Sequence, residues 1–324
     1  MIITRTPFRI SFVGGGTDIP EFYEQNKGAV LSSSINKYMY ISSHPFFDKD
    51  KIRLKYSQTE TVSTIGEIEH ELLKRIFTEM NVGNGIELSS IADIVSGTGM
   101  GSSSSFTVGV LHNLAAQKGK VIDKADLAHT AYKIERSLYS SIGKQDQYAA
   151  SFGGLNVFEF SKNGDVTRTP VLLNSDFKKE LNKKLVLFYV GNRKSTKSIL
   201  KSYEYEKKRT VLRQMTDLVY DLKYALEKES FDDFGAILHE GWLLKKTISN
   251  QISTQEIDTI YETALKNGAK GGKLLGAGAS GFMLFYCEEK YQNNLIRSLE
   301  PTCRRFDFSF EEDGSQVIFQ DTLT

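Results

Sequence analysis

Strand-forming and helix-forming patterns alternate through the first half of the chain. Runs rich in Ile, Val, Tyr and Phe predict strands at residues 1–13, 28–45, 51–56, 85–93 and 152–160. Apolar positions that recur every three or four residues predict helices at 64–80 and 106–117. Asp123 is placed as the N-cap of a further helix, which carries Glu135 near its end.

The second half is more helical. A strand is predicted at 184–190, followed by a long helical stretch with an apolar face made by Ile199, Leu212, Met215, Val219, Leu222 and Leu226. Ser230 should cap a helix that runs to Lys246, and a helix at 254–266 should lead through a glycine-rich loop into a strand at 282–287. The change of pattern predicts an α+β chain with two domains, 1–170 and 171–324.

Composition narrows the class of protein. The 324 residues are 40% hydrophobic, and the longest apolar runs, 185–190 and 282–287, are far shorter than the roughly 20 residues of a membrane span. Charge is balanced at 41 basic against 40 acidic residues, which argues against nucleic-acid and membrane-surface partners. Two cysteines and no secretory signal favour a cytoplasmic protein. The sequence does not decide whether the protein forms a homodimer.

One segment departs from this balance. Residues 178–214 hold twelve Lys or Arg against three Glu. A solvated basic helix face explains such a run. Contact with a polyanionic small molecule is the alternative.

Three glycine-rich loops stand at 14–18, 97–103 and 276–281. In the middle loop, serines follow the glycines and a helix follows the serines, which is the arrangement of a phosphate cradle at a helix N-terminus. No Gly-Lys pair precedes Ser or Thr, so the loop is not the common P-loop. The last loop matches G-x-G-x-x-G, but a preceding helix and a following strand argue against a dinucleotide-binding oxidoreductase.

Two acids lie between the second and third loops. Phosphoryl transfer needs a metal ligand and a group beside the acceptor hydroxyl, and Glu135 and Asp146 suit these roles. Either residue alone would more often be a surface carboxylate or an ion-pair partner. Because both acids lie between the second and third glycine loops, they are candidate active-site residues.

The three loops in this order, with Glu135 and Asp146 eleven residues apart between them, resemble the GHMP kinases, the family of galactokinase, homoserine kinase and mevalonate kinase. The stretch 6–10 with the first loop, 97–105 and 276–281 correspond to the three motifs of the family. The resemblance implies an α+β fold with a ribosomal-S5-like N-terminal half and a ferredoxin-like C-terminal half. It also implies an active site in the cleft, ATP and Mg²⁺ as cofactors, and an alcohol group as phosphate acceptor.

The resemblance also implies a role for individual residues. Asp146 would act as base or orienter for the acceptor hydroxyl, and Arg9 would lower the pKa of that hydroxyl or stabilise the transferring phosphoryl group. Ser103 and Glu135 would hold Mg²⁺. The ATP phosphates would be bound by Gly97, Thr98, Gly99, Met100, Gly101, Ser102, Ser103 and Ser104, and the sugar by Gly15, Gly16, Thr17, Asp18 and Gly278. Arg193 is a candidate on other grounds, because it follows the strand expected at 184–190 and lies in the basic segment. It would bind a phosphate carried by the sugar, and an ordinary exposed cation is the alternative. Ala279 and Ser280 depart from the glycines common in the third motif, and Ser96 from a common proline.

The first loop bears on the acceptor. Galactokinases usually carry a glutamate where this chain has Gly15, and its replacement removes negative charge and opens space. A sugar that already carries a phosphate, such as a phosphorylated heptose, is therefore the expected partner of ATP here, with Arg193 at the distal phosphate. A kinase for unphosphorylated galactose or fucose, and a sugar or ATP sensor without turnover, are the alternatives.

Overall fold

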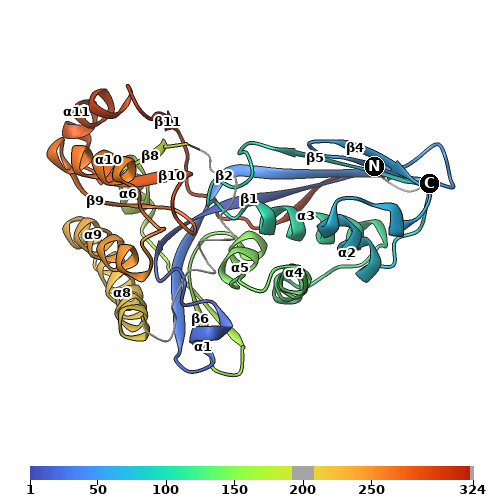
Figure 1. Cartoon of the computed structure of the whole chain (residues 1–324), viewed down its shortest axis with the longest axis horizontal. Helices are drawn as coiled ribbons and strands as arrows, with labels where there is room; N and C mark the ends of the chain where they lie inside the picture. Colours follow the sequence, from blue (N-terminus) through green and yellow to red (C-terminus); the bar gives the residue numbers. More distant parts are fainter. Residues whose placement is uncertain (192–207, 322–324) are drawn as a thin grey trace.

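The computed structural model describes residues 1–191 and 208–321, which form two sheets (Figure 1). The larger sheet has eight strands, with the order β12-β1-β2-β5-β3-β4 and with β6 pairing to β2 and β7 to β6. Its strands are β1 (Ile2–Val13), β2 (Gly28–Pro45), β3 (Ile52–Lys55), β4 (Thr59–Val62), β5 (Ile86–Ala92), β6 (Leu155–Phe160), β7 (Val166–Pro170) and β12 (Gln316–Gln320).

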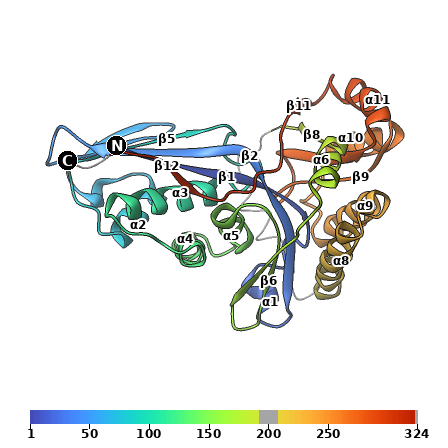
Figure 2. The same cartoon turned by 180° about the vertical axis from the view of Figure 1, so that it is seen from behind.

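Helices cover one face of the larger sheet (Figures 1 and 2). They are α2 (Glu71–Glu79), α3 (Ser102–Gln117), α4 (Lys124–Leu138) and α5 (Gln145–Phe152), while the single-turn helix α1 (Pro20–Tyr23) follows the first glycine loop. Helix α3 packs on β1 and β2 and is almost entirely buried. The loop before α3 is thereby fixed against the sheet.

The smaller sheet has the order β11-β8-β10-β9. Its strands are β8 (Leu185–Tyr189), β9 (Ala269–Leu274), β10 (Phe282–Cys287) and β11 (Arg304–Phe306), and its helices are α6 (Ser175–Lys184), α8 (Arg209–Glu227), α9 (Phe231–Ile248), α10 (Gln255–Lys266) and α11 (Glu289–Leu299). Helix α9 packs along β9 and beside α8. No helix in the described ranges is long and apolar enough to cross a membrane.

The first strand joins the two halves. Phe12, only 1% exposed, lies near the end of β1 and contacts Phe234 of α9 edge to face, with ring centroids 5.5 Å apart. Its ring also meets Phe310, at 6.3 Å. At the other end of β1, Ile2 pairs with Gln320 of β12, so the first and last strands are neighbours (Figure 2).

Most of the expected elements are confirmed, with shifts that have local causes. The helix expected at 64–80 is a 3₁₀ turn (Ile65–Glu67) followed by α2. The Glu60 carboxylate accepts hydrogen bonds from the backbone N–H groups of Glu69 and His70, and the His70 ring then accepts one from Leu73 N, so the helix starts only after His70. Asp123 caps α4 as expected, through bonds from Ala125 N and Asp126 N.

Other expectations need correction. Helix α3 begins at Ser102, four residues before the expected start at Phe106, so the serines form its first turn. Several elements were not expected: helices α1, α5, α6 and α11 and strands β4, β7, β9, β11 and β12. The glycines of β9 make its sequence look like a loop, but a Cβ at Gly271 would lie 2.1 Å from the Gly235 carbonyl oxygen, so glycine permits the close contact with α9. Ile199 lies outside the described residues, and the boundary at 170 stays a prediction.

Phe12 provides a test of the junction between the two halves. Phe12→Ala removes a buried ring that contacts both α9 and the C-terminal segment, and should lower the free energy of unfolding by about 3–5 kcal/mol. Phe47→Ala is the matched control, because that ring is 97% exposed. Urea unfolding of both variants makes the measurement. Equal midpoints for the two variants would contradict the packing described.

Candidate active site

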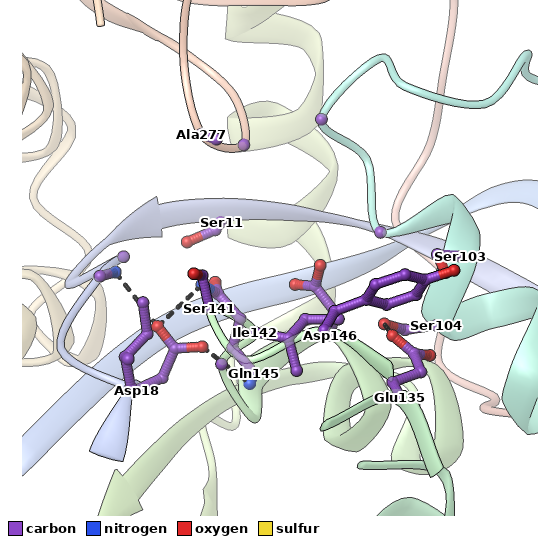
Figure 3. A pocket seen from close by; sticks show the side chains of 18 of the residues that line it. Ser11, Asp18, Ser103, Ser104, Glu135, Ser141, Ile142, Gln145, Asp146 and Ala277 are labelled. Atoms are coloured by element: carbon purple, nitrogen blue, oxygen red, sulfur yellow. Dashed lines mark hydrogen bonds between the residues drawn. The ribbon is translucent and has the colours of Figure 1, made fainter. Parts of the chain in front are cut away.

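The three glycine loops meet around one pocket of about 320 Å³ (Figure 3). Strand β1 supplies Arg9 and Ser11, and the C-terminal half supplies two lysines. The lining is Arg9, Ser11, Gly15, Gly16, Asp18, Ile19, Gly97, Gly99, Gly101, Ser102, Ser103, Ser104, Glu135, Leu138, Tyr139, Ser140, Ser141, Ile142, Gly143, Gln145, Asp146, Lys245, Lys273, Gly276 and Ala277. Most of the residues that the sequence nominated are therefore brought together.

The second loop forms one wall of the pocket. Gly97, Gly99 and Gly101 have φ values of 79°, 78° and 78°, and Gly101 is the residue before the first turn of α3. A 16-residue helix presents unpaired N–H groups and a partial positive charge at this end. The backbone here is suited to an anion such as a phosphate.

The third loop packs directly on the second. A Cβ at Gly276 would lie 2.4 Å from Gly99 Cα, and a Cβ at Gly99 would lie 2.6 Å from the Leu275 carbonyl oxygen. Any side chain at either position would push the loops apart. The two halves of the chain therefore touch through backbone at the edge of the pocket.

Arg9 and Asp146 form the charged centre of the site. Arg9 Nε and Nη2 lie 2.7 Å and 2.6 Å from the same oxygen, Asp146 Oδ1, while Arg9 Nη1 donates to the Gly99 carbonyl at 2.7 Å. Within the described part of the chain, no hydrogen bond reaches Asp146 Oδ2. That oxygen is placed to accept a hydrogen bond from a ligand hydroxyl.

Glu135 is a buried carboxyl at the end of α4 that lies against the first turn of α3 (Figure 3). Its Oε2 accepts hydrogen bonds from Ser104 Oγ at 3.1 Å and Gln147 Nε2 at 3.2 Å. Its Oε1 is buried without a partner. Burial, aided by the nearby Asp146 charge, raises the pKa of Glu135 to about 7.

These residues fit a magnesium ion. The unpartnered Glu135 Oε1 is a hard oxygen ligand, and the exposed Ser103 hydroxyl also lines the pocket. No group of three or more His, Cys, Asp or Glu within residues 1–191 and 208–321 is arranged to hold a metal. A cation at Glu135 would therefore complete its coordination with oxygens of a bound ligand and with water, as Mg²⁺ commonly does.

Asp18 is held rigidly by the protein. Its carboxylate accepts hydrogen bonds from Gly16 N, Gln145 N and Gln145 Nε2, each at 3.1 Å. Burial raises the pKa of Asp18. Gly143 makes room for this carboxylate, because a Cβ there would lie 2.0 Å from Asp18 Oδ2. The first loop and α5 are fixed to each other at the pocket floor.

Some nominated residues do not reach the pocket. The Thr17 hydroxyl lies 2.8 Å from both the Gly14 and the Ala29 carbonyl oxygens and holds the loop in shape. Thr98 and Met100 are fully buried beneath the second loop. Gly278 packs on the Ile252 backbone instead. Arg193 lies outside the described residues.

The structure adds seven polar residues that the sequence did not nominate: Ser11, Tyr139, Ser140, Ser141, Gln145, Lys245 and Lys273. Ser11 Oγ and Gln145 Oε1 are buried without a hydrogen-bond partner in the described chain. A signal for Lys245 existed, since it continues the 3–4 spacing of the buried face of α9. For Lys273 the only sequence signal was its position three residues before the third loop.

Phosphoryl transfer depends on positioning the reacting groups and on neutralising their charge, and the residues of this pocket suit both tasks. Residues 65–154 match the model of the GHMP kinases N terminal domain, and residues 222–300 match that of the GHMP kinases C terminal. A relative in Campylobacter jejuni, D-glycero-alpha-D-manno-heptose 7-phosphate kinase, is 31% identical over 97% of each chain. The chain belongs to the GHMP kinase family, as its motifs predicted.

Solved structures agree on the fold. A D-glycero-D-manno-heptose 1-phosphate kinase from Bacteroides thetaiotaomicron superposes with a TM-score of 0.82 at 24% identity, over 99% of this chain and 100% of that one. Galactokinase of Lactococcus lactis superposes with a TM-score of 0.76 at 18% identity, over 97% and 94%. The expected α+β GHMP kinase fold and the expectation of a phosphotransferase are thereby confirmed.

Glu135 gives the ligand-free protein a defined pH dependence. Its pKa is about 7 in the folded protein against 4.5 for the ordinary group, so folding favours the protonated acid. This contribution to stability is complete below pH 4.5 and is lost as the pH rises through 7. Glu135→Gln should therefore stabilise the protein by about 3 kcal/mol at pH 8 and by little near pH 4.5.

Thermal melts of wild type and Glu135→Gln between pH 4.5 and 8.5, without nucleotide or Mg²⁺, test this expectation. Glu262→Gln serves as the control, because that side chain is exposed and its removal should shift no melt. A constant difference between wild type and Glu135→Gln across the pH range would contradict the raised pKa.

Proposed function

We propose that this chain is an ATP- and Mg²⁺-dependent sugar kinase. Its proposed acceptor is the anomeric hydroxyl of D-glycero-D-manno-heptose 7-phosphate, which would become the 1,7-bisphosphate on the way to GDP-heptose and surface polysaccharide. The observation that carries the kinase assignment is the Arg9–Asp146 pair, which leaves Asp146 Oδ2 open to a hydroxyl beside the phosphate-binding loop.

Each step of the transfer has a residue suited to it. Asp146 Oδ2 would accept the hydrogen bond of the sugar hydroxyl and then its proton. Arg9 would balance the charge that develops on the oxygens around that hydroxyl. The amides of the second loop and the first turn of α3 would hold the nucleotide phosphates. Glu135 and Ser103 would hold Mg²⁺, whose positive charge would neutralise charge on the nucleotide phosphates.

Support for a phosphorylated heptose comes from two sides. The Campylobacter jejuni relative that covers nearly the whole chain is named for that substrate. In the first loop, Gly15 and Gly16 line the pocket without a carboxylate, which leaves room for a sugar that is longer and carries negative charge. Ser11 and Gln145 offer unpaired oxygens for hydroxyl groups of the same sugar.

An ADP-release assay with Mg-ATP tests the acceptor. The panel is heptose 7-phosphate, mannose 6-phosphate, galactose, fucose and mannose. We expect turnover with heptose 7-phosphate and little with the neutral sugars. A preference for galactose or fucose would keep the kinase but overturn the acceptor. Binding of sugar and ATP without turnover on any acceptor would identify a sensor.

Asp146→Asn tests the mechanism. The amide keeps the size of the side chain but cannot take the hydroxyl proton, so kcat with the best acceptor should fall by about 10²–10⁴-fold. The change in KM should be much smaller. Asp50→Asn is the matched control, because its carboxylate is exposed and makes no hydrogen bond in the part of the chain that the structure describes. Steady-state kinetics that match wild type would exclude Asp146 as base or orienter.

A further inference from the structure

Two lysines in the pocket have no part in the steps above. Lys245 projects from α9 and Lys273 from the end of β9, and their side chains are only 4% and 5% exposed. Both line the pocket beside Arg9 and the third loop. Buried lysines are rare unless they are paired with an acid or bind a ligand.

Their hydrogen bonds are incomplete. Lys245 Nζ donates to the Leu274 and Gly276 carbonyl oxygens, at 2.9 Å and 2.6 Å. Lys273 Nζ donates to the Phe12 carbonyl oxygen at 2.9 Å. An ammonium group has three N–H donors, so within the described residues Lys245 keeps one and Lys273 keeps two for a ligand.

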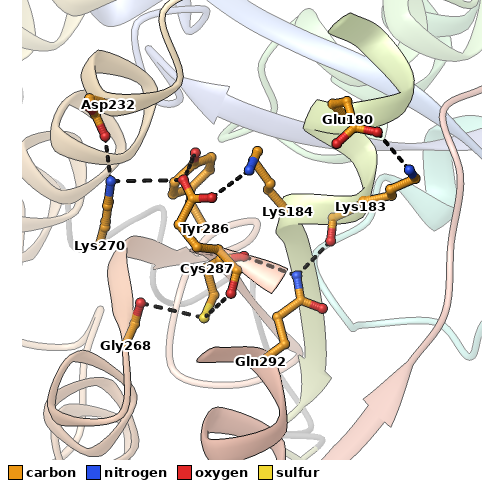
Figure 4. Close-up of polar contacts among 10 residues, drawn as sticks. Glu180, Lys183, Lys184, Asp232, Gly268, Lys270, Tyr286, Cys287 and Gln292 are labelled. Carbon is orange, nitrogen blue, oxygen red and sulfur yellow. Dashed lines mark hydrogen bonds and ion pairs between the residues drawn. The ribbon is translucent and has the colours of Figure 1, made fainter. Parts of the chain in front are cut away.

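Other lysines of the same half show what pairing looks like. In Figure 4, Lys183 pairs with Glu180 at 2.6 Å, Lys184 pairs with Glu288 at 2.5 Å, and Lys270, three residues before Lys273, pairs with Asp232. These pairs lie at the surface or partly buried. In each of these three cases a carboxylate balances the charge of the lysine.

The pocket lysines lack such partners. No Asp or Glu of residues 1–191 or 208–321 forms an ion pair with either of them, and the charges that act on them are cationic: Arg9 on both, and Lys245 on Lys273. Burial, followed by these like charges, lowers the pKa of Lys245 to about 7 and that of Lys273 well below its ordinary value. In the empty pocket the described residues therefore supply no negative charge to either lysine, and the charged form of both side chains is disfavoured.

We propose that Lys245 and Lys273 bind the oxygens of a phosphate group in the pocket, with Lys273 as the principal contact. Lys245 bonds to the carbonyl of Gly276, and Gly276 packs on Gly99, so the pair adjoins the loop proposed to hold the nucleotide phosphates. An oxyanion would accept the three remaining N–H donors and supply the missing negative charge.

The identity of that phosphate rests on the proposed function. A kinase acting on a sugar phosphate brings two phosphates to this space, the transferring group of ATP and the acceptor's own phosphate. Both present the same tetrahedral oxyanion. The lysines recognise this shared chemistry, and kinetics separate the two sources.

Binding of inorganic phosphate and pyrophosphate, followed by calorimetry and by thermal melts, tests the site without turnover. Lys273→Met keeps the length and apolar stem of the side chain and removes the charge. We expect phosphate to bind about 10-fold or more weakly, as befits the loss of a charge-assisted hydrogen bond. The ligand-free variant should melt at or above the wild-type temperature, because it no longer buries an amine whose charged form has no acidic partner among the described residues.

A second variant, Lys245→Met, and a control, Lys246→Met, distinguish phosphate binding from a purely structural role of the pocket lysines. Lys245→Met should also weaken phosphate binding, but it should melt lower, since Lys245 anchors two carbonyls of the third loop. Lys246→Met, at the neighbouring position where the lysine pairs with Asp258, should bind phosphate as wild type does. Wild-type phosphate affinity in Lys273→Met and Lys245→Met would overturn the proposal, as would failure of wild type to bind either anion.

Turnover assays then assign the source, using heptose 7-phosphate and the same heptose without its phosphate. A KM that rises about 10-fold in Lys273→Met only for the phosphorylated acceptor assigns the site to the acceptor's phosphate. A fall of kcat with both acceptors assigns it to the transferring group. If no sugar is turned over, the proposed function fails, yet phosphate binding that depends on Lys273 would still establish the anion site.

Discussion

The arrangement of the pocket depends on Arg9 more than on any other side chain. Its backbone N–H donates to the Met100 carbonyl, and its guanidinium reaches the Gly99 carbonyl and the Asp146 carboxylate. One residue of β1 therefore sets the position of the second loop and of α5 at once. Arginine suits this task because its planar group offers several donors in fixed directions and stays charged when buried. Only 4% of the side chain is exposed, so water competes little with these bonds.

Long strands, capped helices and glycine loops could be predicted because their signals are local. The range expected for β2 and the N-cap at Asp123 match the structure. Within the second loop the amino-acid sequence alone could not predict which residues face the pocket. The structure shows an alternation, with Gly97, Gly99 and Gly101 in the pocket lining and Thr98 and Met100 buried beneath. That alternation follows from the backbone angles, which a string of small residues does not reveal.

Strand β9 and the burial of Lys245 could not be predicted because they depend on tertiary contacts. Strand β9 contains Gly271 and Gly272, and such residues disfavour a strand by themselves. They are accepted because α9 lies close against this strand and β10 pairs with it. The same context converts Lys245 from one more surface cation into a buried one, since the apolar face of α9 includes its position. A lysine at a position that continues the apolar face of a helix therefore indicates a buried cation.

The buried charges of the pocket have a common physical cause. Burial raises the pKa of Glu135 and lowers those of Lys245 and Lys273, so on each side the empty pocket disfavours the charged form. The acid side carries Glu135 and Asp146, the basic side carries the lysines and Arg9, and the Arg9–Asp146 pair is where the two meet. A ligand that is both cation and anion, such as a metal bound to phosphate, would satisfy both sides together. Its binding would draw a proton from Glu135 and favour protonation of the lysines, so the two sides of the pocket would become charged together.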